Sequence, residues 1–181
     1  MSSKAFEAAA KGDIEGLKAC LPDTSPEDLK GVLVTAAERG DLDVVRTLTQ
    51  YGVFDDWAVV SASSFGRTEV VRYLCRHGKG NLKAALIGAA AHGCFETVRI
   101  LTACGVKETD EALADAAMRG YLDIVKHLTE CGADMTAKVY NGESAMSLAW
   151  KRRHAEVCAY FDKVRREGVN SGTLQDGGGG K

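Results

Sequence analysis

Apolar residues recur at spacings of three and four along most of the chain, in short stretches separated by glycine. One stretch covers residues 33–37 and precedes Gly40, and a second covers residues 42–48. This spacing places the apolar side chains on one face of a helix. A glycine between two such stretches suits a helix end, because a left-handed backbone costs little without a Cβ atom. The pattern therefore predicts two short helices joined at Gly40.

The same sequence pattern recurs six times along residues 4–164. Each copy has small residues, a two-residue spacer, a glycine that is replaced in the last copy, and then an acidic residue close to an apolar pair. The glycine position is occupied in turn by Gly12, Gly40, Gly66, Gly93, Gly120 and Arg153. The intervals between copies are 26–28 residues, and the last interval is 33 residues. A repeat of this length predicts a stack of supersecondary units, each a pair of helices.

Residues that cap helices precede several of the predicted units. The candidate starts are Ser25 before Pro26, Asp55 or Asp56 before Trp57, Asn81, and Thr109 before Asp110. Their side-chain oxygens can accept hydrogen bonds from the first backbone N–H groups of a helix.

The repeated sequence pattern resembles the helical half of the ankyrin repeat. Residues 132–149 follow the full-length pattern of that family, with Ala145 where the family usually has proline. The earlier units are shorter: Gly52 lies 10 residues before Ala62, whereas Gly132 lies 17 residues before Ala149. The resemblance implies that the missing residues are the protruding β-hairpin of the repeat. We expect an all-α, ankyrin-like solenoid of about six helix-turn-helix repeats, with at most one full β-hairpin, near residues 134–145.

The length of 181 residues fits one domain at roughly 100–200 residues per domain. We predict a single ankyrin-like repeat domain over residues 1–166. No apolar periodicity remains after that, and residues 167–181 are predicted to be a flexible, glycine-rich C-terminal tail.

Composition and charge are those of a soluble folded protein. Hydrophobic residues make up 45% of the chain, charged residues 27%, and the formal charge is -2. This balance argues against general disorder and against a strongly basic nucleic-acid binder. No apolar run is long enough for a membrane span, and the first residues do not resemble a signal peptide. The predicted location is the cytoplasm, with the nucleus as the alternative.

The chain carries no recognisable catalytic or cofactor motif. It has no phosphate-binding loop, no His-Glu-x-x-His sequence and no Gly-x-Ser-x-Gly sequence. The six cysteines include no Cys-x-x-Cys pair, which predicts reduced thiols rather than a zinc site or a disulfide framework. Cys75 and His77 come closest to a ligand pair, but they are interpreted as a helix-end histidine beside a buried thiol rather than as a metal site. We therefore predict no enzymatic activity, no cofactor and no metal.

Two regularly spaced series of charged residues follow the glycine position of the repeats. An acidic residue lies three positions after it in all six units, and a basic residue lies six positions after it in five of them. Such pairs stabilise a helix by a few tenths of a kcal/mol each. They indicate a solvated outer face, with a functional charge strip as the alternative.

Residues of the first helices that do not belong to the apolar stripe should face outward on the concave surface of the stack. The positions expected to face outward include Glu7, Thr35, Ser61, Gly88, Asp115 and Leu148. The candidate partner-binding residues are Arg39, Phe65, His92, Met118, Arg119, Trp150 and Arg152. Three members of this set are arginines and a fourth is a titratable histidine, which suits an acidic or mixed peptide. The alternative for the basic members is that they stabilise the C-terminal dipole of their own helix.

The C-terminal unit is basic on an otherwise acidic chain. Residues 138–166 hold seven basic and three acidic residues. Trp150 adjoins three of these basic residues and is interpreted either as an interface anchor or as a side chain filling the end of the core. Trp57 is expected to fill the junction where a hairpin is missing.

The resemblance to ankyrin repeats implies a non-enzymatic protein-protein interaction module, acting as an adaptor, scaffold or inhibitor. The expected partner is a protein or peptide, of acidic character if the basic residues contact it, and not a small-molecule substrate. The alternative is weak binding of nucleic acid or anionic lipid through the basic C-terminal repeat, although nucleic acid is not the partner that the overall charge favours.

Overall fold

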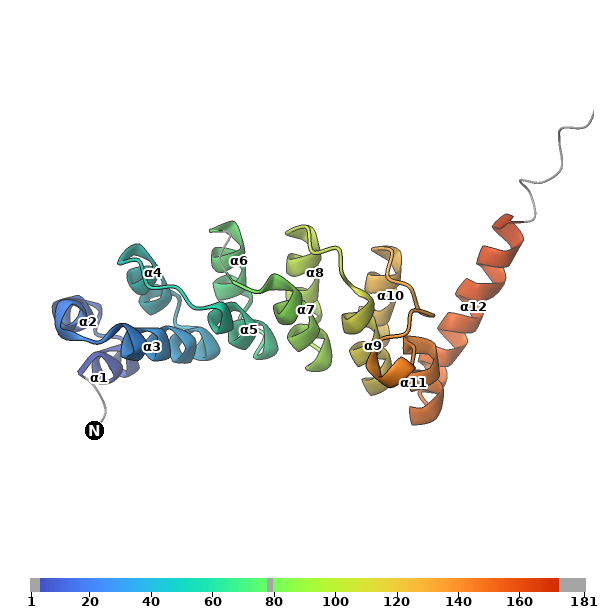
Figure 1. The fold of residues 1–181 in the computed structure, drawn as a ribbon, viewed down its shortest axis with the longest axis horizontal. Helices are drawn as coiled ribbons and strands as arrows, with labels where there is room; N and C mark the ends of the chain where they lie inside the picture. Colours follow the sequence, from blue (N-terminus) through green and yellow to red (C-terminus); the bar gives the residue numbers. More distant parts are fainter. Residues whose placement is uncertain (1–3, 78–79, 173–181) are drawn as a thin grey trace, which may run out of the picture. The chain divides into compact units, whose positions relative to one another are not determined.

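The computed structural model describes residues 4–77 and 80–172, which form six pairs of α-helices (Figure 1). The pairs are α1 (Lys4–Lys11) with α2 (Ile14–Cys20), α3 (Pro26–Arg39) with α4 (Leu42–Gln50), α5 (Asp56–Ser64) with α6 (Thr68–Arg76), α7 (Leu82–Ala91) with α8 (Phe95–Ala103), α9 (Asp110–Arg119) with α10 (Leu122–Glu130), and α11 (Ala145–Arg152) with α12 (Ala155–Gly172). Two short 3₁₀ turns, η1 (Leu21–Asp23) and η2 (Tyr140–Gly142), lie in the connections. The described residues contain no strand. The predicted all-α fold of six helix-turn-helix repeats is confirmed.

The contacts divide the chain into two compact units, Met1–Thr109 and Asp110–Lys181. In the first unit, α1, α3, α5 and α7 pack side by side in one layer, and α2, α4, α6 and α8 pack in another. In the second unit, α9 packs on α11 and α10 packs on α12. The first helices of the pairs are those that carry the candidate partner-binding residues. The single domain over residues 1–166 stays a prediction.

Helices begin where the capping residues predict them. The Ser25 hydroxyl accepts a hydrogen bond from the Asp28 backbone N–H, with a distance of 3.2 Å. The carboxylate of Asp55 accepts from the Trp57 N–H at 2.8 Å, and the side-chain oxygen of Asn81 accepts from the Ala84 N–H at 2.9 Å. Each bond satisfies a backbone donor that has no partner within its own helix.

Small residues let the first helices approach one another closely. Ala62 and Ala89, on α5 and α7, are both fully buried. A Cβ atom on Gly88 would lie 2.5 Å from the Ser64 Oγ atom, so the Ser64 side chain would have to rotate away. The glycine in the middle of α7 therefore favours the close packing of α7 on α5.

The turn between the helices of a pair contains a glycine, and side chains of neighbouring repeats donate hydrogen bonds to its carbonyl groups. Gly40 has a φ of 87°, in the left-handed region that the sequence predicts. The Arg67 Nε of the following repeat donates to the Glu38 carbonyl at 2.8 Å, and the Arg39 Nη2 donates to the Ala10 carbonyl of the preceding repeat at 3.2 Å. These donors satisfy carbonyl groups at the ends of the first helices, which lack partners within the helix.

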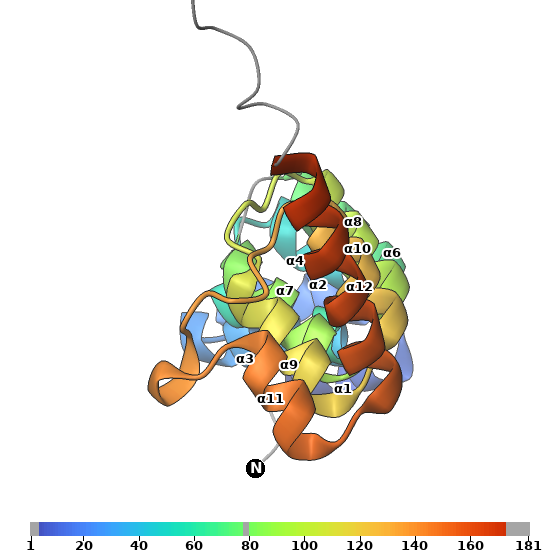
Figure 2. The same ribbon diagram turned by 90° about the vertical axis from the view of Figure 1, so that its right-hand side faces the viewer.

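The longest connection between described helices covers residues 131–144 and precedes α11. Figure 2 shows it (in orange) projecting beside α9 and α11 of the second unit. Its tip is a tight turn in which the Val139 N–H donates to the Glu143 carbonyl at 2.9 Å. The connection lies where the sequence allows one β-hairpin, but it forms a turn without strands.

The last helix is longer than the sequence predicts. α12 continues to Gly172, so residues 167–172 are helical rather than part of a coil. A helix that has already begun adds further turns without a new nucleation cost. The rest of the predicted tail, residues 173–181, lies outside the described residues.

Candidate protein-binding surface

Three of the candidate residues lie at the C-terminal ends of first helices in the first unit. Arg39 is the last residue of α3, Phe65 is the C-cap of α5, and His92 is the C-cap of α7. All three are exposed. Because α3, α5 and α7 are neighbours in one layer, the three side chains follow one another along its edge.

Arg39 has a structural role in addition to its exposure. Its Nε atom lies 3.0 Å from the Asp41 Oδ2 atom, and its Nη2 atom donates to the Ala10 carbonyl. The sequence predicts that a basic residue at a helix C-terminus stabilises the end of its own helix. Arg39 instead binds a carbonyl group at the end of the first helix of the preceding repeat. About half of the Arg39 side chain remains exposed, so part of the guanidinium surface is accessible to a partner.

Phe65 is a large apolar side chain exposed at the C-terminal end of its helix, with 53% of its surface accessible to solvent. His92 follows it on the next repeat. The His92 Nδ1 atom lies 2.8 Å from the Gly88 carbonyl oxygen, which fixes the orientation of the ring. An exposed aromatic ring beside a fixed, exposed imidazole can contact a partner through both apolar and polar atoms.

The other candidates lie in the second unit. Arg119 and Arg152 are the last residues of α9 and α11, and both are exposed, whereas Met118 is half-buried. The Met118 carbonyl oxygen lies 2.9 Å from the Nε2 atom of His154. We refer to Arg39, Phe65 and His92 as the first-helix surface of the first unit, and to Met118, Arg119, Trp150 and Arg152 as the first-helix surface of the second unit.

Trp150 is 57% exposed and does not fill the core. It lies three positions before the left-handed Arg153, and the corresponding residues of the four preceding units are fully buried: Ala37, Ser63, Ala90 and Ala117. The residue one position earlier, Ala149, is buried in the last unit as well. This position therefore faces the following repeat, and Trp150 is exposed because no further helix pair follows α11 and α12 among the described residues.

Four positions differ from what the sequence predicts. Gly88 is expected to face outward, but it faces α5, where a Cβ atom would lie 2.5 Å from the Ser64 Oγ atom. Asp115 and Leu148 are expected to face outward, but both are buried, with 8% and 9% of their surfaces exposed. Asp115 is covered because the Tyr140 hydroxyl donates to its Oδ2 atom at 2.8 Å. Trp57 is expected to fill a junction, but it is 65% exposed on α5, because the small Ala58 and Val59 side chains are the ones that enter the core.

Burial and the neighbouring carboxylate raise the pKa of the Tyr140 hydroxyl well above its usual range. A neutral hydroxyl donating to a buried carboxylate is the stable arrangement, because an ionised pair would repel. The sequence contains no local pattern for this contact, since 25 residues separate the two side chains.

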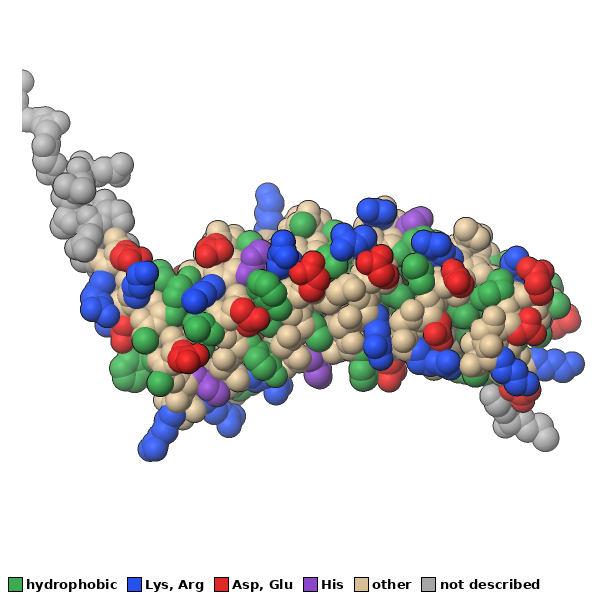
Figure 3. All heavy atoms as spheres, turned by 180° about the vertical axis from the view of Figure 1, so that it is seen from behind, with side chains coloured by type: hydrophobic (Ala, Val, Ile, Leu, Met, Phe, Trp, Pro, Cys, Tyr) green, Lys and Arg blue, Asp and Glu red, His purple; other side chains and the backbone are tan. Residues whose placement is uncertain are grey.

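The second helices carry the predicted charge pairs. Lys18 lies 2.8 Å from Glu15, Arg99 lies 3.1 Å from Glu96, and a similar pair forms in α6. Figure 3 shows acidic and basic side chains interspersed over the face it displays. These paired, exposed charges fit the interpretation of a solvated outer face.

Charges of the C-terminal basic repeat are partly neutralised within the second unit. Lys151 pairs with Glu143, and the Lys163 and Arg165 side chains lie 3.7 Å and 3.1 Å from acidic partners on α12. The described residues hold no cluster of three or more side chains suited to a metal ion. None of the described helices combines the length and the apolar character that a membrane crossing requires.

Comparison with known proteins agrees with this architecture. A family model described as "Ankyrin repeats (3 copies)" matches residues 33–112 and residues 57–139, which together make up more than half of the chain. The chain therefore belongs to the ankyrin-repeat family. Ankyrin repeats generally mediate protein-protein interactions, and the family is typically non-enzymatic. No curated protein matches the chain in sequence.

Proposed function

We propose that this protein is a non-enzymatic interaction module, an adaptor, scaffold or inhibitor that binds a partner polypeptide on the concave face, through the first-helix surface. The observation that carries the proposal is the exposure of Phe65, an apolar ring held at a helix end between the exposed Arg39 and His92 of the neighbouring repeats. Large exposed aromatic side chains flanked by arginine are typical of the residues that contribute most to protein interfaces.

The charges of this surface favour an acidic or mixed partner segment. Arg39, Arg119 and Arg152 end their helices with exposed side chains, and guanidinium groups bind carboxylates in a bidentate geometry. We expect the protein to act in the cytoplasm or the nucleus.

Binding of nucleic acid or anionic lipid through the basic C-terminal repeat is the weaker alternative. Three of its basic side chains already pair with acidic side chains of the same unit, which lowers the charge available to a polyanion. Such binding would weaken steeply as salt concentration rises.

The proposal can be tested by photocrosslinking. A photoreactive phenylalanine analogue replaces Phe65 in one preparation and Arg72, on the outer face, in another. Both preparations are incubated with a native cell extract and irradiated. We expect a discrete protein adduct at position 65 and little at position 72; adducts at position 72 alone would contradict the proposed surface.

A further inference from the structure

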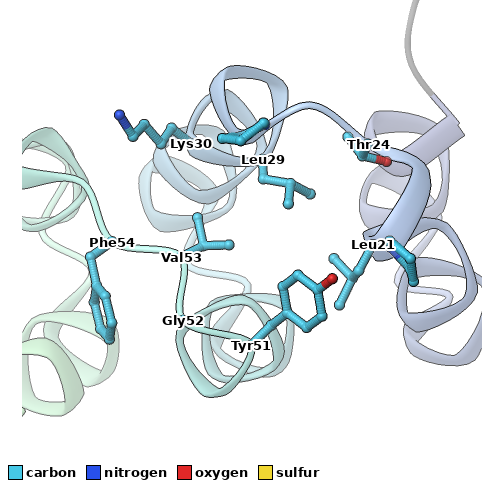
Figure 4. Close-up of a pocket in the computed structure, with 10 residues that line it drawn as sticks. Leu21, Thr24, Leu29, Lys30, Tyr51, Gly52, Val53 and Phe54 are labelled. Atoms are coloured by element: carbon cyan, nitrogen blue, oxygen red, sulfur yellow. The ribbon is translucent and has the colours of Figure 1, made fainter.

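A cavity of about 500 Å³ lies in the first unit, away from the first-helix surface (Figure 4). It lies between the end of the first repeat, at η1, the start of α3 and the connection that leads from α4 to α5. Leu21 and Leu29 form its buried floor, and the side chains of Tyr51 and Val53 point into the same space. Half of the Tyr51 surface is exposed at the rim.

The cavity is open because the connection beside it is short. Five residues, 51–55, join α4 to α5, whereas residues 131–144 join α10 to α11 and extend to contact α9 through the Tyr140 hydroxyl. The short connection does not extend over the cavity, so Tyr51 and part of Val53 remain accessible above the buried Leu21 and Leu29.

A second, smaller cavity of about 260 Å³ adjoins the first and shares Lys30 and Phe54 with it. Its other lining side chains include the carboxylates of Asp55 and Asp56. Lys30 itself lies 3.4 Å from Glu27, so its charge is already matched. The described side chains that line this smaller cavity therefore include two carboxylates beside one paired lysine, and carboxylates can attract a cation.

The elongated arrangement fits a peptide better than a compact metabolite. A metabolite site needs several polar groups that converge on one ligand. Here the Thr24 hydroxyl is already used, because it donates to the Cys20 carbonyl at 2.7 Å. An exposed aromatic ring borders the site instead, because Phe54 lies on the far side of Val53 from Leu21.

We propose that this groove binds an extended partner peptide that inserts one apolar side chain between Leu21, Leu29 and Tyr51 and places an adjacent Lys or Arg against Asp55 and Asp56. The apolar cavity supplies affinity, and the carboxylates select the cationic neighbour. The groove shares no residue with the first-helix surface, so each proposal stands or fails independently.

The experiment uses a displayed library of random short peptides, selected on the full-length protein, followed by titration of the enriched peptides as synthetic, labelled probes. We expect the enriched sequences to combine an apolar residue with a nearby Lys or Arg. Tyr51→Ala removes one wall of the cavity and Asp56→Lys reverses the charge beside it; each should weaken binding about tenfold or more.

Two matched variants serve as controls. Phe65→Ala truncates an equally exposed aromatic residue on the first-helix surface, and Asp43→Lys reverses an exposed acidic residue in the first turn of α4. Both should leave the affinity within about twofold, and circular dichroism should show that all four variants fold. The proposal is overturned if no peptide is enriched, if the enriched peptides are acidic, or if Phe65→Ala abolishes binding while Tyr51→Ala does not. It is also overturned if the groove binds a second copy of the chain, so that Tyr51→Ala converts a dimer to a monomer.

Discussion

The His154 ring closes the last repeat junction by contacting two residues of the preceding repeat. Its Nε2 atom lies 2.9 Å from the Met118 carbonyl oxygen, and its Nδ1 atom lies 2.5 Å from the place where a Cβ atom on Gly120 would be. Arg67 has the same relationship to the junction before it, since it binds the Glu38 carbonyl and its Cδ atom lies 3.0 Å from the Cβ position of Gly40. The glycine thus permits the left-handed backbone of the turn and also leaves room for a side chain of the following repeat.

Replacement of Gly120 should therefore cost more than backbone strain alone. Gly120→Ala combines a φ of 81° with displacement of His154, whereas Gly132→Ala has a similar φ of 95° and nothing within 4 Å of the new Cβ atom. We expect Gly132→Ala to lower the free energy of unfolding by about 1 kcal/mol through strain. Gly120→Ala should lower it by at least about 1 kcal/mol more, through loss of the histidine hydrogen bond. Urea denaturation of both variants measures the difference, and equal losses would contradict the assigned role of His154.

Arg67 should contribute more to stability than an arginine of the outer face. Arg67→Ala removes the donor to the Glu38 carbonyl at the end of α3, and we expect a loss of about 1 kcal/mol in the free energy of unfolding. Arg72→Ala removes only an exposed pair with Glu69, in which the charged atoms are 3.7 Å apart, and should cost less than about 0.5 kcal/mol. Thermal unfolding ranks the two variants, and the reverse order would show that the junction bond is dispensable.

Tyr140 should hold the long connection against α9. Tyr140→Phe removes the donor to the buried Asp115 carboxylate, so we expect the free energy of unfolding to fall by about 1–3 kcal/mol. Adding Asp115→Ala to this variant should cost less than the sum of the single changes, since the two side chains are partners. A strictly additive double-mutant cycle would show that the contact does not stabilise the protein.

The same contact predicts an alkaline limit to stability. Because the folded state raises the pKa of Tyr140, the folded protein keeps the hydroxyl proton at a pH where the unfolded chain has lost it. The stabilisation is complete below about pH 10, the ordinary tyrosine pKa, and is lost as the pH rises above it. Tyr140→Phe should show a smaller loss of stability than the parent protein between neutral pH and about pH 11.

The cysteines should differ in reactivity. Burial, together with a hydrogen bond to Cys104, raises the pKa of the Cys75 thiol to about 12. Because the thiolate is the nucleophile, Cys75 should react with iodoacetamide far more slowly at mildly alkaline pH than the exposed Cys131. Peptide mass spectrometry after timed alkylation measures both rates, and equal rates would mean that Cys75 is more accessible than its burial indicates.

The periodic part of this structure could be predicted from the sequence, because glycine turns and apolar spacing are local features. Gly40 and Gly120 mark helix ends, and Ser25 and Asn81 begin helices where their side chains predict it. Each repeat carries the same signal, so an error in one unit does not change the fold.

The features that depend on non-local contacts could not be predicted in this way. Asp115 is buried by a tyrosine from a connection 25 residues away, and Trp150 is exposed although the equivalent Ala117 is buried. The cavity beside Tyr51 depends on how two connections lie relative to each other. No spacing within one helix encodes these relationships.

The central claim is that the first-helix surface, and not the outer face, binds the partner. The most direct measurement is a binding titration of folded variants with the protein captured by crosslinking at position 65. Phe65→Ala and Arg119→Glu should each weaken binding by about 1–3 kcal/mol, whereas Arg46→Glu and Arg99→Glu on the second helices should leave the affinity nearly unchanged. If the Arg46 and Arg99 variants lose binding while the Phe65 and Arg119 variants keep it, the recognition surface lies on the opposite layer.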